Sequence, residues 1–284
     1  MTARIATVAF LVGGLALTAA AAELKTQTIA AFDRYVVQAE ERIRQEQRSP
    51  ESFLAINSLP PAACSEEEAR FRRGEVLVEK HGTSPTQIPG GLIHHWVGVI
   101  FIPGATTGHV LLVVQDYDHL VRYYHPEVVT SQLLSRNGED FHIAMRLRKH
   151  KVVTVVLDTE YDVHYGHLDT AHQFSLSHST RVAEVADLGE RNEHTLDNGH
   201  DHGFMWRLNT YWRFVQLAGG VLVQCEAISL TREIPTGLGW LVGPMINDIP
   251  RDSLQFTLSA TRDAVLGQTT DHPMQTQTAQ TGKQ

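Results

Sequence analysis

The stretch Phe204–Leu230, FMWRLNTYWRFVQLAGGVLVQCEAISL, decides the fold because two alternating apolar runs flank a pair of glycines. Alternation of apolar and polar residues is typical of strands that bury one face. A two-residue turn at Gly219-Gly220 joins the two runs into a hairpin. The apolar side chains of the two runs share one face only if an even-numbered residue of the first run opposes an odd-numbered residue of the second.

This rule predicts the register of the hairpin. The Gly219-Gly220 turn places Trp212 opposite Ala227 and Arg213 opposite Glu226. The polar residues then share the other face, where we expect Arg207, Arg213 and Glu226 to form cross-strand ion pairs.

Strands and helices follow in a defined order outside this hairpin. The apolar run 92–102 predicts a strand that stops at Pro103-Gly104, and Thr106 or Thr107 then caps a helical segment that Pro126 closes. Residues 127–136 and 139–149 form a hairpin through the Asn137-Gly138 turn, and strands follow at 151–165 and 172–185. Pro250 suits the first turn of a final helix.

This order resembles the START-like (SRPBCC, helix-grip) superfamily, most of all its exported bacterial members. The residues that carry the resemblance are 113–148, with Tyr123-Tyr124-x-Pro126 before a strand, the hairpin 202–235 and the helix 249–265. The resemblance implies an α+β fold in which a curved antiparallel sheet wraps around a long C-terminal helix, with an N-terminal helical appendage. It also implies a hydrophobic cavity between sheet and helix, where members mostly carry lipids, sterols, quinones or polyketides and a minority catalyse reactions.

Candidate ligand-binding residues follow from that cavity and from the alternating apolar faces. His178 is the one histidine on such a face, and it would either orient a ligand carbonyl or hydroxyl or be an ordinary hydrogen-bonded core residue. Trp240, between the hinge residues Gly237 and Gly239 and the last helix, would act as a portal flap. The full set is Val153, Leu157, Tyr161, Tyr165, Phe174, His178, Phe204, Trp206, Leu208, Trp212, Trp240 and Leu258.

His200 and His202 form an H-x-H pair, which can present two imidazoles to one metal. A site needs a third or fourth ligand, and the local candidates are Asp197, Asp201 and His194. An isolated H-x-H specifies little, so we expect no metal and no cofactor. The motifs of serine hydrolases, zinc proteases and nucleotide-binding loops do not occur in the sequence.

Residues 1–22 predict a signal peptide, because Arg4 precedes an uncharged run that ends at Ala20-x-Ala22. An uncleaved anchor helix is the alternative. Cleavage after Ala22 makes the protein periplasmic or secreted and removes Arg4, so Lys+Arg falls from 24 to 23 against 32 Asp+Glu and the net charge moves from −8 to −9. That charge excludes nucleic acid as a partner and leaves transient membrane contact open.

The expected organisation is a signal peptide (1–22), an N-terminal helical appendage and joint (23–90), a START-like domain (91–267) and a disordered tail (268–284). Cys64 and Cys225 can pair if their Cα atoms approach within about 7 Å, and a buried free thiol at Cys225 is the alternative.

We therefore expect a protein that binds a hydrophobic small molecule or lipid without catalytic residues. A cyclase- or dehydratase-type enzyme that uses His178 and a tyrosine is one alternative. The other is an interaction module whose N-terminal helix docks a protein partner that the sequence does not identify.

Overall fold

A computed structural model describes residues 24–54, 70, 74–151, 154–196, 200–233 and 239–271, without the side chains of 239–247 and 268–271. Its centre is a ten-stranded antiparallel sheet whose main path runs β1-β3-β10-β9-β7-β6-β5-β4, with β2 paired to β3 and β8 to β7. The strands are β1 (Leu77–Lys80), β2 (Thr86–Ile88), β3 (Gly91–Pro103), β4 (Val128–Asn137), β5 (Asp140–His150), β6 (Thr154–His167), β7 (His172–Ala186), β8 (His194–Thr195), β9 (Arg207–Leu217) and β10 (Gly220–Arg232).

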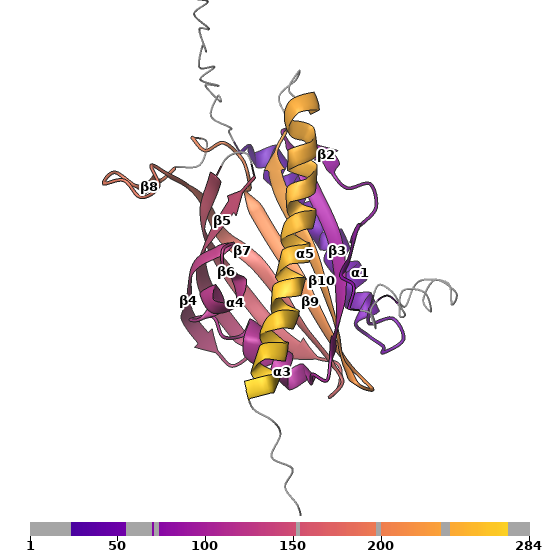
Figure 1. Cartoon of the computed structure of the whole chain (residues 1–284). Coiled ribbons are helices and arrows are strands. Elements are labelled where there is room, and N and C mark those ends of the chain that lie inside the picture. Colours follow the sequence, from indigo (N-terminus) through magenta and orange to yellow (C-terminus); the bar gives the residue numbers. More distant parts are fainter. Residues whose placement is uncertain are drawn as a thin grey trace, which may run out of the picture.

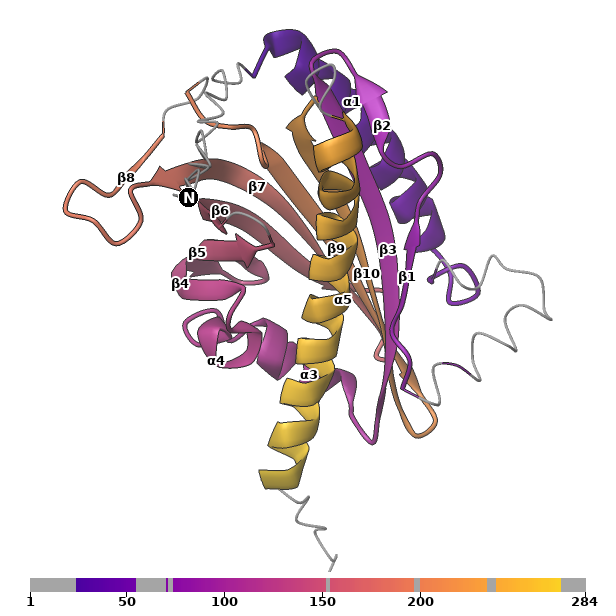
Figure 2. The ribbon, with the colours of Figure 1, turned by 45° about the horizontal axis from the view of Figure 1, so that its top comes forward.

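Helices cover both faces of this sheet. The long α5 (Gly239–Asp271) crosses one face, called the inner face here, with α3 (Thr107–Val114) and α4 (Leu120–Tyr124) beside it (Figure 1). The N-terminal α1 (Thr26–Glu46) lies against the opposite, outer face (Figure 2).

The strand order confirms the expected fold class. The first long strand, β3, is followed by the helical excursion α3–α4 and by a meander whose last strand, β10, returns to pair with β3. The sheet curves around α5, and α1 is the N-terminal helical appendage (Figure 2). This is the START-like, helix-grip arrangement.

The structure corrects two helix boundaries. The excursion is two helices rather than one, and the Thr106 hydroxyl caps the first by accepting a hydrogen bond from the His109 amide. The last helix begins at Gly239, so Pro250 lies in its interior and not in its first turn. The helix continues to Asp271, past the expected start of a disordered tail at 268; residues 272–284 lie outside the described part.

The hairpin has the expected parity but a different register. Trp212 pairs with Cys225 and Arg213 with Gln224, two positions away from the prediction. The turn residues are Ala218 and Gly219, and Gly219 has a φ of +88° that favours glycine. Since the shift is by two residues, every side chain stays on its predicted face.

The sheet and α5 approach each other closely at Gly98 of β3. A Cβ atom at Gly98 would lie 2.5 Å from Leu258 Cδ1 and 3.1 Å from Leu254 Cγ of α5. Both leucines are buried in a core cluster with Ile100 and Val223. The missing side chain at Gly98 therefore sets how closely α5 packs.

We expect Gly98→Val to lower the free energy of unfolding by about 1–3 kcal/mol, because overpacking displaces the buried leucines. Urea unfolding followed by circular dichroism measures this. Gly108→Ala is the matched control: that glycine is exposed in α3, where a Cβ meets only Thr106 Oγ1 at 3.7 Å. Equal midpoints for the two variants would contradict the role of Gly98.

Candidate functional site

The inner face carries a cluster of buried aromatic and aliphatic side chains between β4–β6, α4 and α5. Phe256 and Ala260 of α5 pack against it, as do Met145 and Leu208 from the sheet. We call its buried members the aromatic cluster: Tyr117, Leu120, Tyr124, Val128, Phe141, Ile143, Tyr161, Val163 and Tyr165.

Two of the four tyrosine hydroxyls in this cluster bond to each other, and a third has a partner on α5. Tyr117 Oη lies 2.7 Å from Tyr165 Oη, and Tyr124 Oη lies 2.9 Å from Thr261 Oγ1. Burial raises the pKa of Tyr124 to about 12. It also raises the pKa of Tyr165, with the neighbouring Tyr117 adding to the shift. These groups are therefore neutral hydroxyls at physiological pH.

The fourth tyrosine differs. Tyr161 is 2% exposed, and its hydroxyl makes no hydrogen bond of normal geometry. Burial raises its pKa to about 12, against a smaller lowering by the neighbouring Thr159 hydroxyl. Ser131 Oγ on β4 is likewise buried and unbonded. A buried polar group without a partner is costly, so these two hydroxyls require an explanation.

A groove of about 430 Å³ runs between α4 and α5, next to the aromatic cluster. Phe256 and Ala260 belong to both, because they line the groove and pack against the cluster. A ligand in this groove therefore contacts side chains that also cover the interior. The α4–α5 groove is lined by Arg122, Tyr123, Phe256, Ser259, Ala260, Asp263 and Ala264.

Six of the candidate residues derived from the sequence lie on the inner face or against it. Tyr161 and Tyr165 are in the aromatic cluster, and Leu208 packs against it. Leu157 is on the same face of β6, since it alternates in step with Tyr161. Trp212 and Leu258 belong to the adjoining core under α5.

The structure places other candidates away from the inner face. Phe174 lies over Gly166 on the outer face, and Trp206 packs with Phe32 of α1. His178 also points to the outer face. Phe204 precedes β9 and is 40% exposed. The physical reason is that α1 makes the outer face apolar as well, so an apolar pattern cannot tell one face from the other.

The side chains of two candidates lie outside the described part of the chain. Val153 lies outside the described residues. Trp240 belongs to the first turn of α5 and not to a loop, and its side chain is outside the described part.

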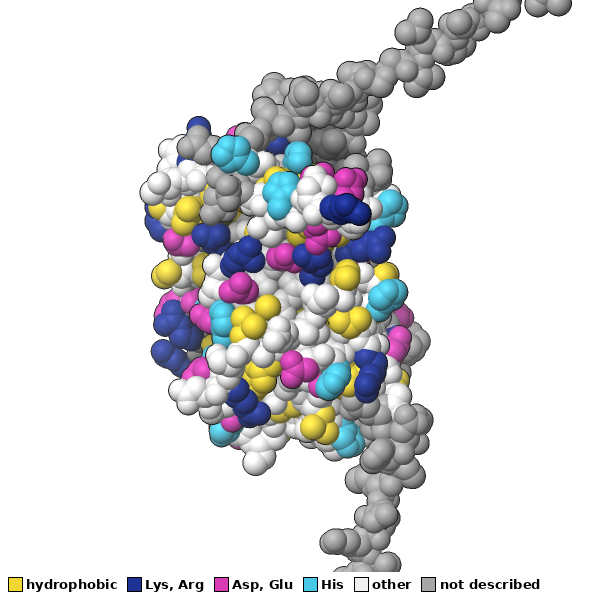
Figure 3. All heavy atoms as spheres, turned by 90° about the vertical axis from the view of Figure 1, so that its left-hand side faces the viewer, with side chains coloured by type: hydrophobic (Ala, Val, Ile, Leu, Met, Phe, Trp, Pro, Cys, Tyr) yellow, Lys and Arg dark blue, Asp and Glu magenta, His cyan; other side chains and the backbone are white. Residues whose placement is uncertain are grey.

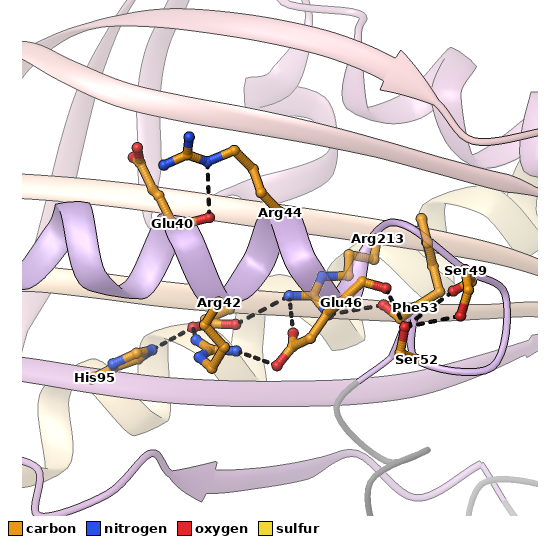
Figure 4. A network of polar contacts seen from close by, with 10 residues as sticks. Glu40, Arg42, Arg44, Glu46, Ser49, Ser52, Phe53, His95 and Arg213 are labelled. Atoms are coloured by element: carbon orange, nitrogen blue, oxygen red, sulfur yellow. Dashed lines mark hydrogen bonds and ion pairs between the residues drawn. The ribbon is translucent and has the colours of Figure 1, made fainter.

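A charged network beneath α1 occupies the outer face (Figure 4). Arg213 and Glu226 are fully buried there. Arg213 Nη2 lies 2.6 Å from Glu46 Oε2 of α1, and 3.7 Å from Glu226 Oε2. His95 Nε2 lies 2.6 Å from Glu226 Oε1, which also receives Arg42 of α1.

The sequence therefore identified the Arg213–Glu226 pair but not its burial. The pair lies on the expected outer face, which α1 covers. We expected Arg207 to form a cross-strand ion pair as well. Its Nη1 instead donates a hydrogen bond to the Trp206 carbonyl. Burial alone would raise the pKa of Glu226, but the His95 hydrogen bond and the charges of Arg42 and Arg213 lower it to about 2.

His178 also helps to attach α1 to the sheet. Its Nε2 lies 2.6 Å from Glu40 Oε1 of α1, and Tyr211 Oη donates to that carboxylate at 2.9 Å. The hydrogen bond with His178 lowers the pKa of Glu40. His178 thus holds α1 on the sheet and faces away from Tyr161 and Tyr165.

The H-x-H pair also has a structural contact. His202 Nδ1 lies 2.6 Å from Glu184 Oε1, and its backbone amide donates to the same carboxylate. Asp197 lies outside the described residues. Within the described ranges, no group of three or more histidine, cysteine or acidic side chains has a geometry that could hold a metal ion.

A second depression, of about 280 Å³, lies on the outer face of β4–β7, and its charges compensate one another. Arg146 bonds both oxygens of Asp158 at 2.7 and 3.0 Å and Glu193 at 2.7 Å, while Arg181 pairs with Glu160 at 3.7 Å. Charges of both signs and histidines are interspersed on the side of the molecule that carries β4 (Figure 3). The α4–α5 groove is therefore the better site for an apolar ligand.

No family model matches the chain, and no curated protein is similar to it. Among solved structures, it is similar to a STAR-related lipid transfer protein from Xanthomonas axonopodis, at 19% identity and a TM-score of 0.41 over 67% of this chain and 98% of that one. Human STARD10 is similar at 8% identity and a TM-score of 0.42, over 76% of this chain and 84% of that one. The Streptomyces aromatase/cyclase Zhui is similar at 13% identity and a TM-score of 0.42, over 62% of this chain and 93% of that one. The fold is START-like. That assignment rests on the strand order and on the position of α5.

No helix in the described part of the chain combines the length and the apolar character needed to cross a membrane.

We expect Glu226→Gln to destabilise the protein by about 3–5 kcal/mol at pH 7, because it leaves buried cations uncompensated. The pKa of Glu226 is depressed in the folded state, so its stabilising contribution is complete above its ordinary value of 4.5 and is lost as the pH falls toward about 2. The wild type should therefore lose stability across that window, and Glu226→Gln should lose less.

Urea unfolding at pH 7, 4 and 3 measures both effects. Glu41→Gln is the matched control, since that α1 carboxylate is half exposed and its contacts are with Arg44 at 3.4 Å and Gln45 at 3.0 Å on the same helix. A Glu226→Gln variant with the stability and pH slope of this control would refute the assignment of the buried charge.

Proposed function

We propose that the protein binds a hydrophobic small molecule or lipid, with the α4–α5 groove as the opening and the aromatic cluster as the interior of the site. The observation that carries the proposal is the pair Phe256 and Ala260, which line the groove and cover the cluster at once. Ligand sites of this kind combine apolar walls with a few polar groups that fix orientation. The inner-face hydroxyls supply those groups.

The two alternatives receive less support. His178 and the inner tyrosines are on opposite faces of the sheet, so the expected catalytic pairing does not form. An enzyme on this scaffold would need another set of groups. The apolar side of α1 packs on the chain's own sheet through Phe32, Ala39 and Ile43. A protein partner would therefore have to displace α1 in order to use that surface.

We also propose that the protein is exported, on the strength of the signal-peptide pattern in residues 1–22. N-terminal sequencing of the protein recovered outside the cytoplasm tests this. A chain that begins at Glu23 would support cleavage, and a chain that begins at Met1 in the membrane fraction would contradict it.

Native mass spectrometry of the protein from Glu23 onward, purified without detergent, tests the binding function. We expect an adduct that organic extraction identifies as a lipid or another apolar compound. Ser259→Trp should reduce the adduct by at least about tenfold, because an indole occupies the groove that Ser259 lines. Gln255→Trp is the matched control on an exposed position of the same helix.

An unshifted mass that also resists a panel of apolar ligands would overturn the proposal. Equal adducts in the two tryptophan variants would instead exclude the α4–α5 groove as the opening.

His178→Ala should leave the adduct unchanged, because His178 contacts α1 and not the inner face. Its expected effect is a local loosening of α1, measured as faster amide hydrogen exchange across residues 26–46. Loss of the ligand with intact α1 protection would contradict this and favour a role for His178 at the site.

A further inference from the structure

In and beside the aromatic cluster, Tyr161 Oη and Ser131 Oγ are buried polar atoms that the fold itself does not explain. Tyr161 is on β6 and Ser131 on β4, and both flank β5, where their cross-strand neighbours are Ile143 and Met145. The two hydroxyls thus occupy adjacent rows on one face of the sheet. Both are buried without a hydrogen bond of normal geometry.

The remaining tyrosine hydroxyls of the aromatic cluster are occupied. Tyr117 and Tyr165 bond to each other, and Tyr124 bonds to Thr261. The cluster therefore offers a ligand one phenol that can donate without breaking an internal bond. Since burial keeps that phenol protonated, it donates at any physiological pH.

Charge is absent from this cluster. The buried charged side chains in the described part of the chain are Asp201, Arg213 and Glu226. Asp201 bonds to the Trp206 indole, and the other two lie beneath α1 on the outer face. An ionised group placed in the cluster would lose its hydration without gaining a counter-charge.

We propose that the ligand carries an uncharged oxygen, such as a ketone or an ester carbonyl, which accepts a hydrogen bond from Tyr161 Oη with Ser131 Oγ beside it. The rest of the ligand is apolar and extends from the aromatic cluster toward the α4–α5 groove, past Phe256 and Ala260, which adjoin both. This assignment rests on the proposed binding function and names its ligand class. Fatty-acid carboxylates and other anions are poor ligands for the inner end of the site.

The test uses three probes of equal chain length: 2-dodecanone, dodecane and dodecanoate at pH 8. The full protein is incubated with an equimolar mixture, separated from unbound probe by gel filtration, and extracted for gas chromatography. We expect the wild type to retain the ketone about 3- to 10-fold over dodecane, the range that one neutral hydrogen bond supplies, and to retain the least dodecanoate.

Tyr161→Phe should bring the ratio of ketone to dodecane close to one while dodecane retention stays the same. Tyr211→Phe is the matched control, because it removes a buried hydroxyl on the outer face, where that hydroxyl donates to Glu40, and it should keep the wild-type ratio. Circular dichroism and a cooperative thermal transition establish that both variants are folded.

Three results would each overturn the ligand assignment: a ketone-to-dodecane ratio near one in the wild type, an unchanged ratio in Tyr161→Phe, or a preference for dodecanoate. In each case, retention of dodecane would still support the binding function. Retention of no probe by any folded variant would overturn the binding function and the ligand assignment with it.

Discussion

Two buried charges on neighbouring strands, Arg213 of β9 and Glu226 of β10, are the constraint on which the outer half of the molecule depends. Taking an unpaired charge out of water costs several kcal/mol, and their separation of 3.7 Å leaves each in need of further partners. Arg42 and Glu46 of α1 supply these, with His95 from β3. The N-terminal helix is therefore an integral part of the fold, since removing it would expose charges that the sheet cannot satisfy alone.

The attachment of α1 to the sheet also explains why the sheet is apolar on both faces. α5 covers the inner face and α1 covers the outer face of β3, β10 and β9, so those strands bury residues on each side. In β10 the burial is nearly continuous, although the sequence alternates polar and apolar residues. Gln224 and Glu226 are polar but lie on a covered face. The alternation of polar and apolar residues, taken alone, predicts that such a face is exposed to solvent.

The sequence was sufficient for the element order, the strand meander and the parity of the last hairpin. These depend on local signals such as Asn137-Gly138 and on period-two patterns, which survive in any tertiary context. It was insufficient for the exact register. With adjacent glycines at 219 and 220, the turn can lie at 218–219 or at 219–220, and both turns keep every side chain on the same face. The structure chooses Gly219 for the turn, while Gly220 pairs with Leu217 where a Cβ would lie 2.3 Å from the Ile102 carbonyl. That contact is with β3, about 120 residues away in the chain, so no local pattern records it.

The candidate site shows the same division. Tyr161 and Tyr165 follow from alternation on β6, whereas Phe174, His178 and Trp206 belong to the face that α1 covers. The α5 contribution from Phe256 and Ala260 was missed. These two residues are four apart and form a second apolar row, two positions out of step with Leu254 and Leu258. The two covered faces are also chemically distinct, because the fully buried Arg213–Glu226 pair lies on the outer one, whereas the buried members of the aromatic cluster on the inner one are uncharged. Substitutions among the neutral inner side chains therefore need not disturb the charge pairs that attach α1.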